Sequence, residues 1–470
     1  MGALYSKKSR TAVAIRSLGS AGLLFAARAL AVIYQLRFAN HTFGSNFGGL
    51  IALLNQITFY ILLAELGLAA ATTSLLFEPV HLGDNGRVAA LLRALQRDVR
   101  RIVFVLAPLS VVASAVLSLW LRKQVPLVPL LFSLLLTCMS ALMTFMALPY
   151  QSHFNASDRV PIRNVILACG FTFKVVLGIV LAKAMHSFIG LPLGTTLIGV
   201  VELLVQRWLV MPSIERQVIS DEMIANARHS IHEKARFVVA HRVGYLFIYQ
   251  SDYIILLLSS SLSLLGYYAQ YQYIYAGLLS FSIAVGGTLT ARIAKRQIDA
   301  GRQAFPVFYR KTSTLIAAAA LLCGLGFYLF ADLAIRILYK SNRFDHKAVL
   351  LFAVLLMLNI VKINDDLWID TTGFYHKGYY LPILEAITYV ALGLFLVRHF
   401  EIPGILYAGI VTNLLFSVTF KAFIIGGGVM DRKIPSTFVV KLVNLTGIGL
   451  AFYLFVSLIR LLPFLSALGG

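Results

Sequence analysis

The chain has 470 residues, of which 59% are hydrophobic and only 13% charged, and its mean hydropathy is +0.82. Soluble domains of this length are far more polar, so the chain is predicted to be a polytopic membrane protein. Its formal net charge of +21 is spread over the connections between apolar runs, without the aromatic interleaving of a nucleic-acid-binding module. We therefore expect contacts with membrane lipid headgroups and not with nucleic acid.

Apolar runs of about 20 residues, enough to cross a bilayer, recur along the whole chain. The first follows a basic N-terminus and has small residues of the signal-cleavage kind only inside the run, so a retained span is expected. The twelve core spans are expected near residues 14–38, 46–76, 102–121, 126–150, 162–183, 190–211, 237–259, 264–291, 312–335, 346–369, 379–398 and 402–423. A thirteenth apolar segment follows near residues 437–460.

The connections between these spans share Lys and Arg unevenly, with most of them on the side of the N-terminus. The positive-inside rule therefore predicts a cytoplasmic N-terminus. One of these connections places Val88, Leu91, Leu92, Leu95 and Val99 at helical spacing, with Arg residues mostly on other faces. This segment is expected to lie flat on the inner leaflet or to form a solvated loop helix.

The longest polar connection lies almost midway between the first and twelfth spans and divides six spans from six. The predicted domains are an N-terminal six-helix bundle over 1–211, a cytoplasmic linker over 212–236, a C-terminal six-helix bundle over 237–424 and an additional helix within 425–470. The predicted fold class is an all-α polytopic membrane protein with twelve core transmembrane helices and an extra C-terminal span.

Three charges lie near the middle of predicted spans, where a side chain cannot simply extend to water. Arg28 is the only charge in the middle of the first span, and Lys174 and Asp252 lie at mid-depth in the fifth and seventh. Each costs about 2.5 to 3.5 kcal/mol on insertion scales, so a lipid-facing position is unfavourable. These side chains are expected to face a hydrated interior or one another.

The stretch "LNIVKINDDLWIDTTG" ends the tenth span with Lys362, Asp365, Asp366 and Asp370. The uncharged run before Lys362 is shorter than a bilayer crossing, so Lys362 is expected inside the membrane at a functional cavity. Asp365 and Asp366 follow it at i+3 and i+4, where ion pairs within the helix lower the cost of burial. In a second interpretation, Asp366 and Asp370 reach the cytoplasmic interface and only end the span.

Further candidates lie nearer the ends of spans. Glu65, Glu202, Glu385 and Lys421 fall in the inner halves of their spans, where a side chain either serves a cavity or reaches the interface. Arg242 lies one or two turns inside the seventh span and is an additional candidate cation.

The sequence lacks the motifs of the common catalytic sites. It has no G-x-x-x-x-G-K-[ST] loop, no H-E-x-x-H and no nucleophile elbow, and its ten histidines have no ligand spacing. Cys138, Cys169 and Cys323 lie singly in apolar runs, as packing residues do. Neither an enzyme nor a metal site is predicted.

Three stretches carry a resemblance to a known family. They are "FGSNFGGLIALLNQITFYILLAELGLAAATTSLLFE", "YQSDYIILLLSSSLSLLGYYAQYQYIYAGLLS" and "FADLAIRILYKSNRFDHKAVLLFAVLLML". With six plus six spans, they resemble the polysaccharide-transporter branch of the multidrug/oligosaccharidyl-lipid/polysaccharide (MOP) exporter superfamily, to which O-antigen flippases belong. Two features depart from the family: "YKSNRF" stands where a Gly is frequent, and the segment after residue 436 exceeds the twelve spans of many relatives.

The resemblance implies a MATE-like fold of two pseudo-symmetric six-helix bundles around a central cationic cavity with alternating access. It also implies that an undecaprenyl-pyrophosphate-linked oligosaccharide, such as an O-antigen repeat unit, is moved across the bacterial inner membrane. Membrane lipids and the polysaccharide polymerase machinery are the implied partners. The positions similar to the family's are Gly67 in the "ELGL" turn, which is expected to act as a hinge, Asp252 and Arg28.

A pyrophosphate in a low-dielectric region needs positive partners, and Arg offers a bidentate fork where Lys offers a point charge. The candidate cations are Arg28, Lys174, Lys362 and Arg242. The candidate acids, which either pair with a cation or carry a coupling proton or Na⁺, are Asp252, Glu65 and Asp365. No other cofactor is expected.

Three alternatives stay open at this level. A multidrug exporter of the same fold would favour an acidic, aromatic cavity for cationic drugs, whereas two of the three mid-depth charges are basic. A peptidoglycan-precursor flippase has relatives that commonly have fourteen spans. A non-transporting membrane scaffold would not need Arg28 or Asp252.

Overall fold

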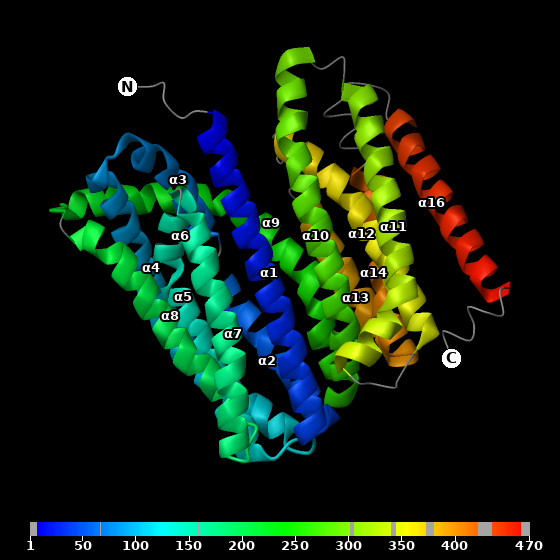
Figure 1. Cartoon of the computed structure of the whole chain (residues 1–470), viewed down its shortest axis with the longest axis horizontal. Coiled ribbons are helices and arrows are strands. Elements are labelled where there is room, and N and C mark those ends of the chain that lie inside the picture. Colours follow the sequence, from blue (N-terminus) through cyan, green and yellow to red (C-terminus); the bar gives the residue numbers. More distant parts are fainter. Residues whose placement is uncertain are drawn as a thin grey trace. The chain divides into compact units, whose positions relative to one another are not determined.

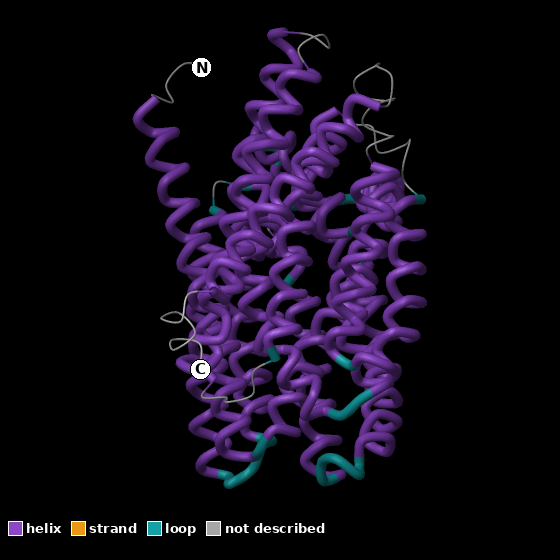
Figure 2. The backbone as a smooth tube through the Cα atoms, turned by 90° about the vertical axis from the view of Figure 1, so that its right-hand side faces the viewer, coloured by secondary structure: helices purple, strands orange, loops and turns teal. Residues whose placement is uncertain are grey.

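The computed structural model describes residues 7–65, 67–157, 159–215, 217–300, 305–339, 345–372, 380–421 and 435–461. All elements in these ranges are helices, joined by short loops and turns (Figures 1 and 2). Helices satisfy every backbone hydrogen bond within one segment, which is what a hydrocarbon environment requires.

The chain divides into two compact units. Unit 1 comprises Met1–Val243 and Ser261–Gly266, and unit 2 comprises Gly244–Ser260 and Tyr267–Gly470. The chain first passes from unit 1 to unit 2 within one continuous helix, α9 (Asp221–Ser259).

Unit 1 is built mainly from the first eight helices, and several short connections in it begin or end at residues suited to turns. Gly83 has a left-handed φ of 71° after α3, and the carboxylate of Asp84 accepts a hydrogen bond from the backbone N–H of Arg87 at 2.9 Å, which caps α4. The helices are α1 (Lys7–Phe43), α2 (Ser45–Leu63), α3 (Leu68–Leu82), α4 (Asn85–Leu121), α5 (Leu127–Met146), α6 (Leu148–Ala156), α7 (Val160–Ala184) and α8 (Gly190–Glu215).

Unit 2 contains the C-terminal part of α9 and most of α10, followed by the remaining helices. The described side chains of α12 are almost all buried, because α11, α14 and the π-helical segment η3 pack around it. The elements are α10 (Leu262–Ala300), α11 (Phe305–Tyr339), α12 (His346–Thr372), α13 (Leu381–Phe400), α14 (Ile402–Thr412), η3 (Asn413–Phe420) and α16 (Pro435–Leu461).

Among the described residues, 11 helices are long and apolar enough to cross a membrane. The thirteenth apolar segment is one of them, as part of α16. The spans expected at 237–259 and 264–291 fall in α9 and α10, where many side chains lie outside the described residues.

The span expected over 46–76 is broken. Helix α2 ends at Leu63 and α3 begins at Leu68, with Gly67 between them at φ 78°. That left-handed conformation favours glycine, because a Cβ would be strained there. The sequence predicts a turn at "ELGL", but the apolar run continues on both sides of it. One span is therefore expected where the structure has two helices.

The segment expected to lie flat on the inner leaflet does not do so. It is the start of α4, which runs without interruption into the following span. Leu92 and Leu95 are fully buried in a core that α3, α6 and α8 also contribute to. The apolar face therefore packs against protein instead of lipid, which a helical pattern alone cannot distinguish.

The connection between α8 and α9 is also largely packed. The first turns of α9 place Ile224 and Ile231 in the same core of unit 1. Buried Asp98 of α4 accepts a hydrogen bond from Arg228 Nε at 2.7 Å and lies 2.8 Å from His232 Nε2. An apolar contact and a charged one thus attach the beginning of α9 to α4.

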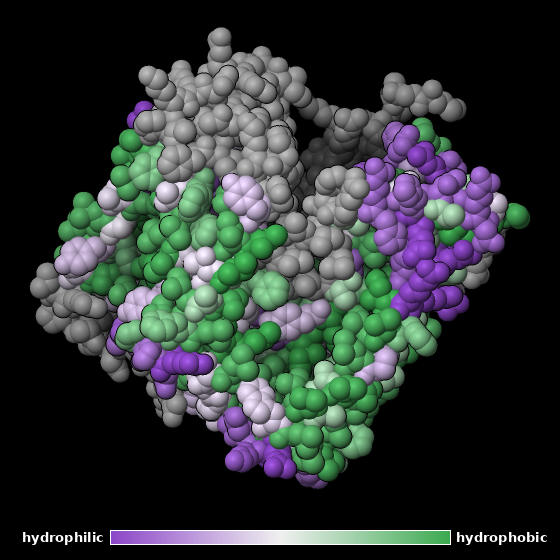
Figure 3. Space-filling view, turned by 180° about the vertical axis from the view of Figure 1, so that it is seen from behind, coloured by the Kyte–Doolittle hydropathy of each residue, from purple (hydrophilic) through white to green (hydrophobic). Residues whose placement is uncertain are grey.

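The outer surface is apolar over large areas. Figure 3 shows hydrophobic side chains covering much of the face drawn, with hydrophilic ones gathered in patches near its edges. On α4 the exposed apolar residues begin at Phe104 and include Leu109 and Val116. Exposed apolar stretches of this length are typical of helices that contact lipid.

Candidate functional site

A row of polar side chains lies buried along α12 in unit 2. Asn359, Lys362, Asn364 and Asp365 are each at most 5% exposed, although they continue an apolar helix. Charges in such a place are stable only when they are paired and hydrogen-bonded. The partners of Lys362 and Asp365 come from α11, α13 and α16.

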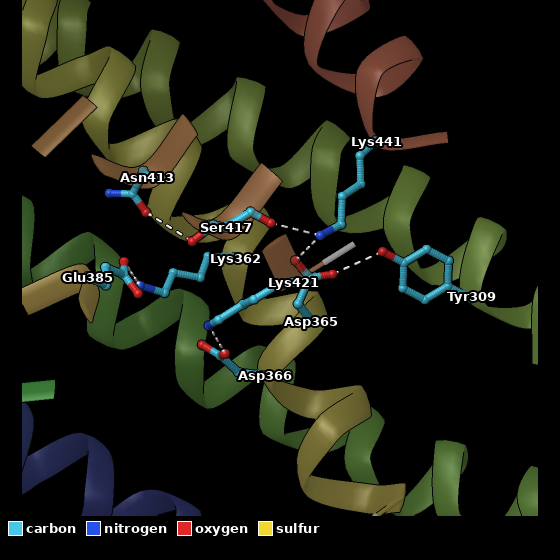
Figure 4. A network of polar contacts seen from close by, with 9 residues as sticks. All are labelled: Tyr309, Lys362, Asp365, Asp366, Glu385, Asn413, Ser417, Lys421 and Lys441. Atoms are coloured by element: carbon cyan, nitrogen blue, oxygen red, sulfur yellow. Dashed lines mark hydrogen bonds and ion pairs between the residues drawn. The ribbon is translucent and has the colours of Figure 1, made fainter. Parts of the chain in front are cut away.

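Three lysines neutralise the three acids of this cluster, as Figure 4 shows. Lys362 pairs with Glu385 of α13, and both side chains are buried. Lys441 of α16 lies 2.5 Å from Asp365 and also donates to the carbonyl oxygen of Ser417 at 2.8 Å. The hydroxyl of Tyr309 donates to the other oxygen of Asp365 at 2.9 Å.

Lys421, which follows η3, lies 2.5 Å from Asp366, and 48% of the Asp366 side chain is exposed. The expectation that Asp365 and Asp366 take their ion pairs from within α12 is therefore wrong. Their lysines lie on other segments, Lys441 on α16 and Lys421 just after η3. The second interpretation, in which Asp366 and Asp370 reach the cytoplasmic interface and only end the span, stays a prediction.

Asp252 occupies a different polar cluster of unit 2. Its two carboxylate oxygens accept hydrogen bonds from the hydroxyls of Tyr268 on α10 and Tyr389 on α13, and all three residues are buried. Within the described part of the chain, no lysine, arginine or histidine forms an ion pair with it. The alternative in which Asp252 pairs with a cavity cation is thus not what the structure shows.

A small cavity beside Asp252 connects these polar groups. It is large enough to hold a water molecule, and its polar lining is Asp252, Gln272, Tyr275, Asn359, Glu385, Tyr389, Thr412 and Asn413. The buried hydroxyl of Thr412 has no hydrogen-bond partner among the described residues. Asn413 also lines a second cavity, with Lys362, Asp365 and Lys441. Carboxylate, hydroxyl and amide oxygens of this kind suit a proton, a water molecule or a hard cation.

An ion pair lies at mid-span in unit 1. Lys174 Nζ on α7 lies 2.5 Å from Glu202 Oε2 on α8, with 13% and 10% of the two side chains exposed. The pairing follows from the close packing of α7 and α8, in which Gly178 and Gly194 approach backbone to backbone.

Arg28 of α1 is exposed and has no ion-pair partner among the described residues. Its guanidinium lies 5.8 Å from the centre of the Phe171 ring, and Lys174 Nζ lies 5.4 Å from the centre of the same ring. The two cations that the sequence singled out in unit 1 are therefore neighbours, on α1 and α7, beside one aromatic ring.

The remaining candidates are placed as follows. Glu65 is buried in the turn between α2 and α3, beside Gly67. Arg242 belongs to α9, but its side chain lies outside the described residues, as does that of Asp370. The hinge function of Gly67 and the cavity function of Glu65 stay predictions.

Sequence reasoning gave no weight to Lys441, Tyr389 or Tyr309. Lys441 stands singly near the start of the last apolar run, where a charge can ordinarily reach the interface. The sequence did offer one signal for Lys441, namely that this lysine lies within the thirteenth apolar segment. Among the described residues, no group of three or more His, Cys, Asp or Glu side chains is arranged to hold a metal ion.

Neither a protein-family model nor a curated protein sequence matches the chain. Solved structures do resemble it. The lipid II flippase MurJ in an inward closed conformation superposes with a TM-score of 0.66 at 12% identity, over 93% of this chain and 92% of MurJ. An inward-facing multidrug resistance MATE family transporter of the MOP superfamily gives 0.64 at 12% identity, over 90% of this chain and 95% of that one.

The chain has the fold of MurJ and the MATE transporters. A third structure, the eukaryotic MATE transporter AtDTX14, agrees with a TM-score of 0.61 at 13% identity, over 92% of this chain and 99% of the transporter. The predicted fold class, an all-helical MATE-like membrane protein, is confirmed. At these identities the likeness concerns the fold alone, so the cargo has to be argued from the residues of this chain.

Proposed function

We propose that the chain is a flippase that moves a lipid-pyrophosphate-linked oligosaccharide across the bacterial cytoplasmic membrane by alternating access. Its fold is shared by MurJ, which is called a lipid II flippase, and by multidrug transporters. The fold is therefore compatible with both kinds of cargo. The distribution of charge distinguishes between them.

The observation that carries the proposal is Arg28. It lies near the middle of a predicted span, is exposed on α1, and has no carboxylate partner among the described residues. Exposure to lipid at that depth would cost about 2.5 to 3.5 kcal/mol, so the guanidinium needs water or an anion beside it. A pyrophosphate matches both its charge and its fork of donors.

Lys174 is the second cation that we assign to the cargo, because its Nζ and the Arg28 guanidinium lie near the same Phe171 ring, although Lys174 is paired with Glu202 in the structure. Lys362 was expected to belong to the same set. It is instead buried and neutralised by Glu385, so we assign it to the polar interior of unit 2. Asp252 is the candidate for the coupling proton or Na⁺, since among the described residues two tyrosine hydroxyls hold its oxygens, beside a cavity with room for water.

Two alternatives differ in cargo. A multidrug exporter of the same fold would carry cationic compounds, for which an unpaired Arg28 is unfavourable. A peptidoglycan-precursor flippase is favoured by the likeness to MurJ and would use the same cations. An O-antigen or other polysaccharide repeat unit is our preferred cargo, with the polysaccharide polymerase machinery as the partner that receives it.

The test is a flipping assay in reconstituted liposomes with a short lipid-pyrophosphate oligosaccharide, with and without proton or Na⁺ gradients. Arg28→Ala is expected to lower the flipping rate at least about tenfold, because one charge-assisted contact to a phosphate contributes about 1.5 to 3 kcal/mol. Asp252→Asn is expected to retain cargo binding and to lose the dependence on the gradient.

Arg122→Ala is the matched control, since Arg122 is exposed at the end of α4 and outside the proposed site. It is expected to flip at the wild-type rate. Transport of cationic dyes without any flipping of lipid pyrophosphates would replace the proposal with the multidrug alternative. Normal function of a folded Arg28→Ala protein would support a scaffold.

A further inference from the structure

Glu202 of α8 is a buried carboxylate to which the proposed function gives no task. One of its oxygens, Oε2, lies 2.5 Å from Lys174 Nζ. The other oxygen, Oε1, is buried and has no hydrogen-bond partner among the described residues. A carboxylate in this situation depends on one lysine for its whole neutralisation.

The helix packing places it there. Helices α7 and α8 run antiparallel, and Ala182 lies against Gly190 and Gly178 against Gly194. Continuing the same register brings Glu202 over Gly170, where an added Cβ would come within 1.4 Å of Glu202 Oε1. The absence of a side chain at Gly170 thus provides the space for the carboxylate, one helical turn from Lys174.

Few other charges face Glu202. Helix α5 carries no acidic or basic residue, and α4 carries none between Arg101 and its end at Leu121. On α6 the titratable side chains are Tyr150 and His153, and Arg207 of α8 itself is exposed. Lys174, with Arg28 near the same Phe171 ring, therefore supplies the positive charge near this carboxylate.

We propose that Glu202 is a proton-binding site linked to anion binding at Lys174, so that a pyrophosphate and one proton bind to unit 1 together. This inference rests on the proposed function. When the ammonium of Lys174 turns to a phosphate oxygen, Glu202 loses its counter-charge while it is still buried. Breaking a buried pair in this way is strongly unfavourable, and uptake of a proton from water onto a Glu202 oxygen removes the unpaired charge.

The reverse step follows from linkage. When the anion leaves, Lys174 returns to Glu202 and the proton is released to water. No covalent bond changes: the added proton neutralises Glu202, so the charge of Lys174, together with that of Arg28, is available to the pyrophosphate. Glu202 then has two effects: it keeps Lys174 in place without cargo, and it makes anion affinity rise as the pH falls.

The test is calorimetric titration of the purified protein with farnesyl pyrophosphate in detergent at pH 8, in buffers of different ionisation enthalpy. Wild type is expected to take up close to one proton per ligand bound. Glu202→Gln is expected to take up none and to bind on the order of tenfold more tightly, because no pair has to be broken. Its affinity is also expected to vary less between pH 6 and pH 8 than that of wild type.

Lys174→Met is the second variant, and it keeps the proposal testable if Glu202→Gln does not fold. It is expected to lose proton uptake as well, because Glu202 is already protonated without its lysine, but to bind more weakly than wild type. Glu78→Gln is the matched control, since Glu78 is 67% exposed at its side chain, and it is expected to behave as wild type.

Binding by wild type without proton uptake would overturn the role of Glu202 and leave the proposed function standing. A folded Glu202→Gln protein that kept the proton uptake of wild type would overturn that role in the same way. Absence of binding by wild type and variants alike would contradict the proposed function itself, and with it this inference.

Discussion

At the scale of single residues, the pair Lys441 and Asp365 shows how unit 2 holds charge in its interior. Only 2% of each side chain is exposed. Lys441 also donates to the Ser417 carbonyl, and Asp365 also accepts from Tyr309. A buried pair whose two members are both further hydrogen-bonded contributes little net stability over an apolar replacement, whereas removing one partner leaves an uncompensated charge.

We therefore expect Lys441→Met to lower the free energy of unfolding by about 3 to 5 kcal/mol, because Asp365 is left alone in the interior. The double variant Lys441→Met with Asp365→Leu is expected to recover much of that loss. Unfolding in detergent, followed by circular dichroism with increasing denaturant, measures both.

Lys421→Met is the matched comparison, because its partner Asp366 is half exposed and can be solvated. Its expected cost is about 1 kcal/mol or less. Equal losses for Lys441→Met and Lys421→Met would show that burial does not set the cost of these pairs.

At the scale of elements, the crossing of α7 and α8 decides which residues of unit 1 meet. A Cβ at Gly194 would lie 2.4 Å from the backbone nitrogen of Gly178, and a Cβ at Gly190 would lie 2.1 Å from that of Ala182. Small residues at both crossings let the backbones touch, as is common between membrane helices. This contact fixes the register that pairs Lys174 with Glu202.

Gly194→Ala is expected to destabilise the protein by about 1 to 3 kcal/mol, because the added methyl group has no space and the helices must separate. Thermal unfolding of the purified protein measures the loss. Gly199→Ala in the same helix is the control, since the nearest atom to its Cβ would be 3.4 Å away, and its stability is expected to stay the same or rise. A tolerated Gly194→Ala would show that the two helices do not pack this closely.

At the scale of the whole molecule, the distribution of Lys and Arg predicts the orientation in the membrane. The connection between α8 and α9 is expected in the cytoplasm, and the connection between α4 and α5 on the opposite side. Val218 in the first and Lys123 in the second are both exposed, so each can carry a reporter without disturbing the interior.

In a variant whose three native cysteines are replaced, Lys123→Cys is expected to react with a membrane-impermeant maleimide in intact cells. Val218→Cys is expected to react only in inverted membrane vesicles. Gel-shift quantification of the labelled fraction reads both positions. The opposite pattern would reverse the predicted cytoplasmic N-terminus.

The sequence by itself determined the all-helical membrane fold. The thickness of the hydrocarbon layer requires runs of about 20 apolar residues, and this requirement is visible in composition and periodicity without knowledge of any contact. For the same reason it identified Lys362, Asp365, Glu202 and Glu385 as charges within spans, because each interrupts such a run.

Only the tertiary structure decided what those charges contact. Lys362 meets a residue 23 positions away and Asp365 one that is 76 positions away, so the choice of partner depends on which helices pack together. The burial of the start of α4 was hidden for the same reason. An apolar residue has the same pattern in the sequence whether it faces lipid or another helix, and only packing distinguishes the two.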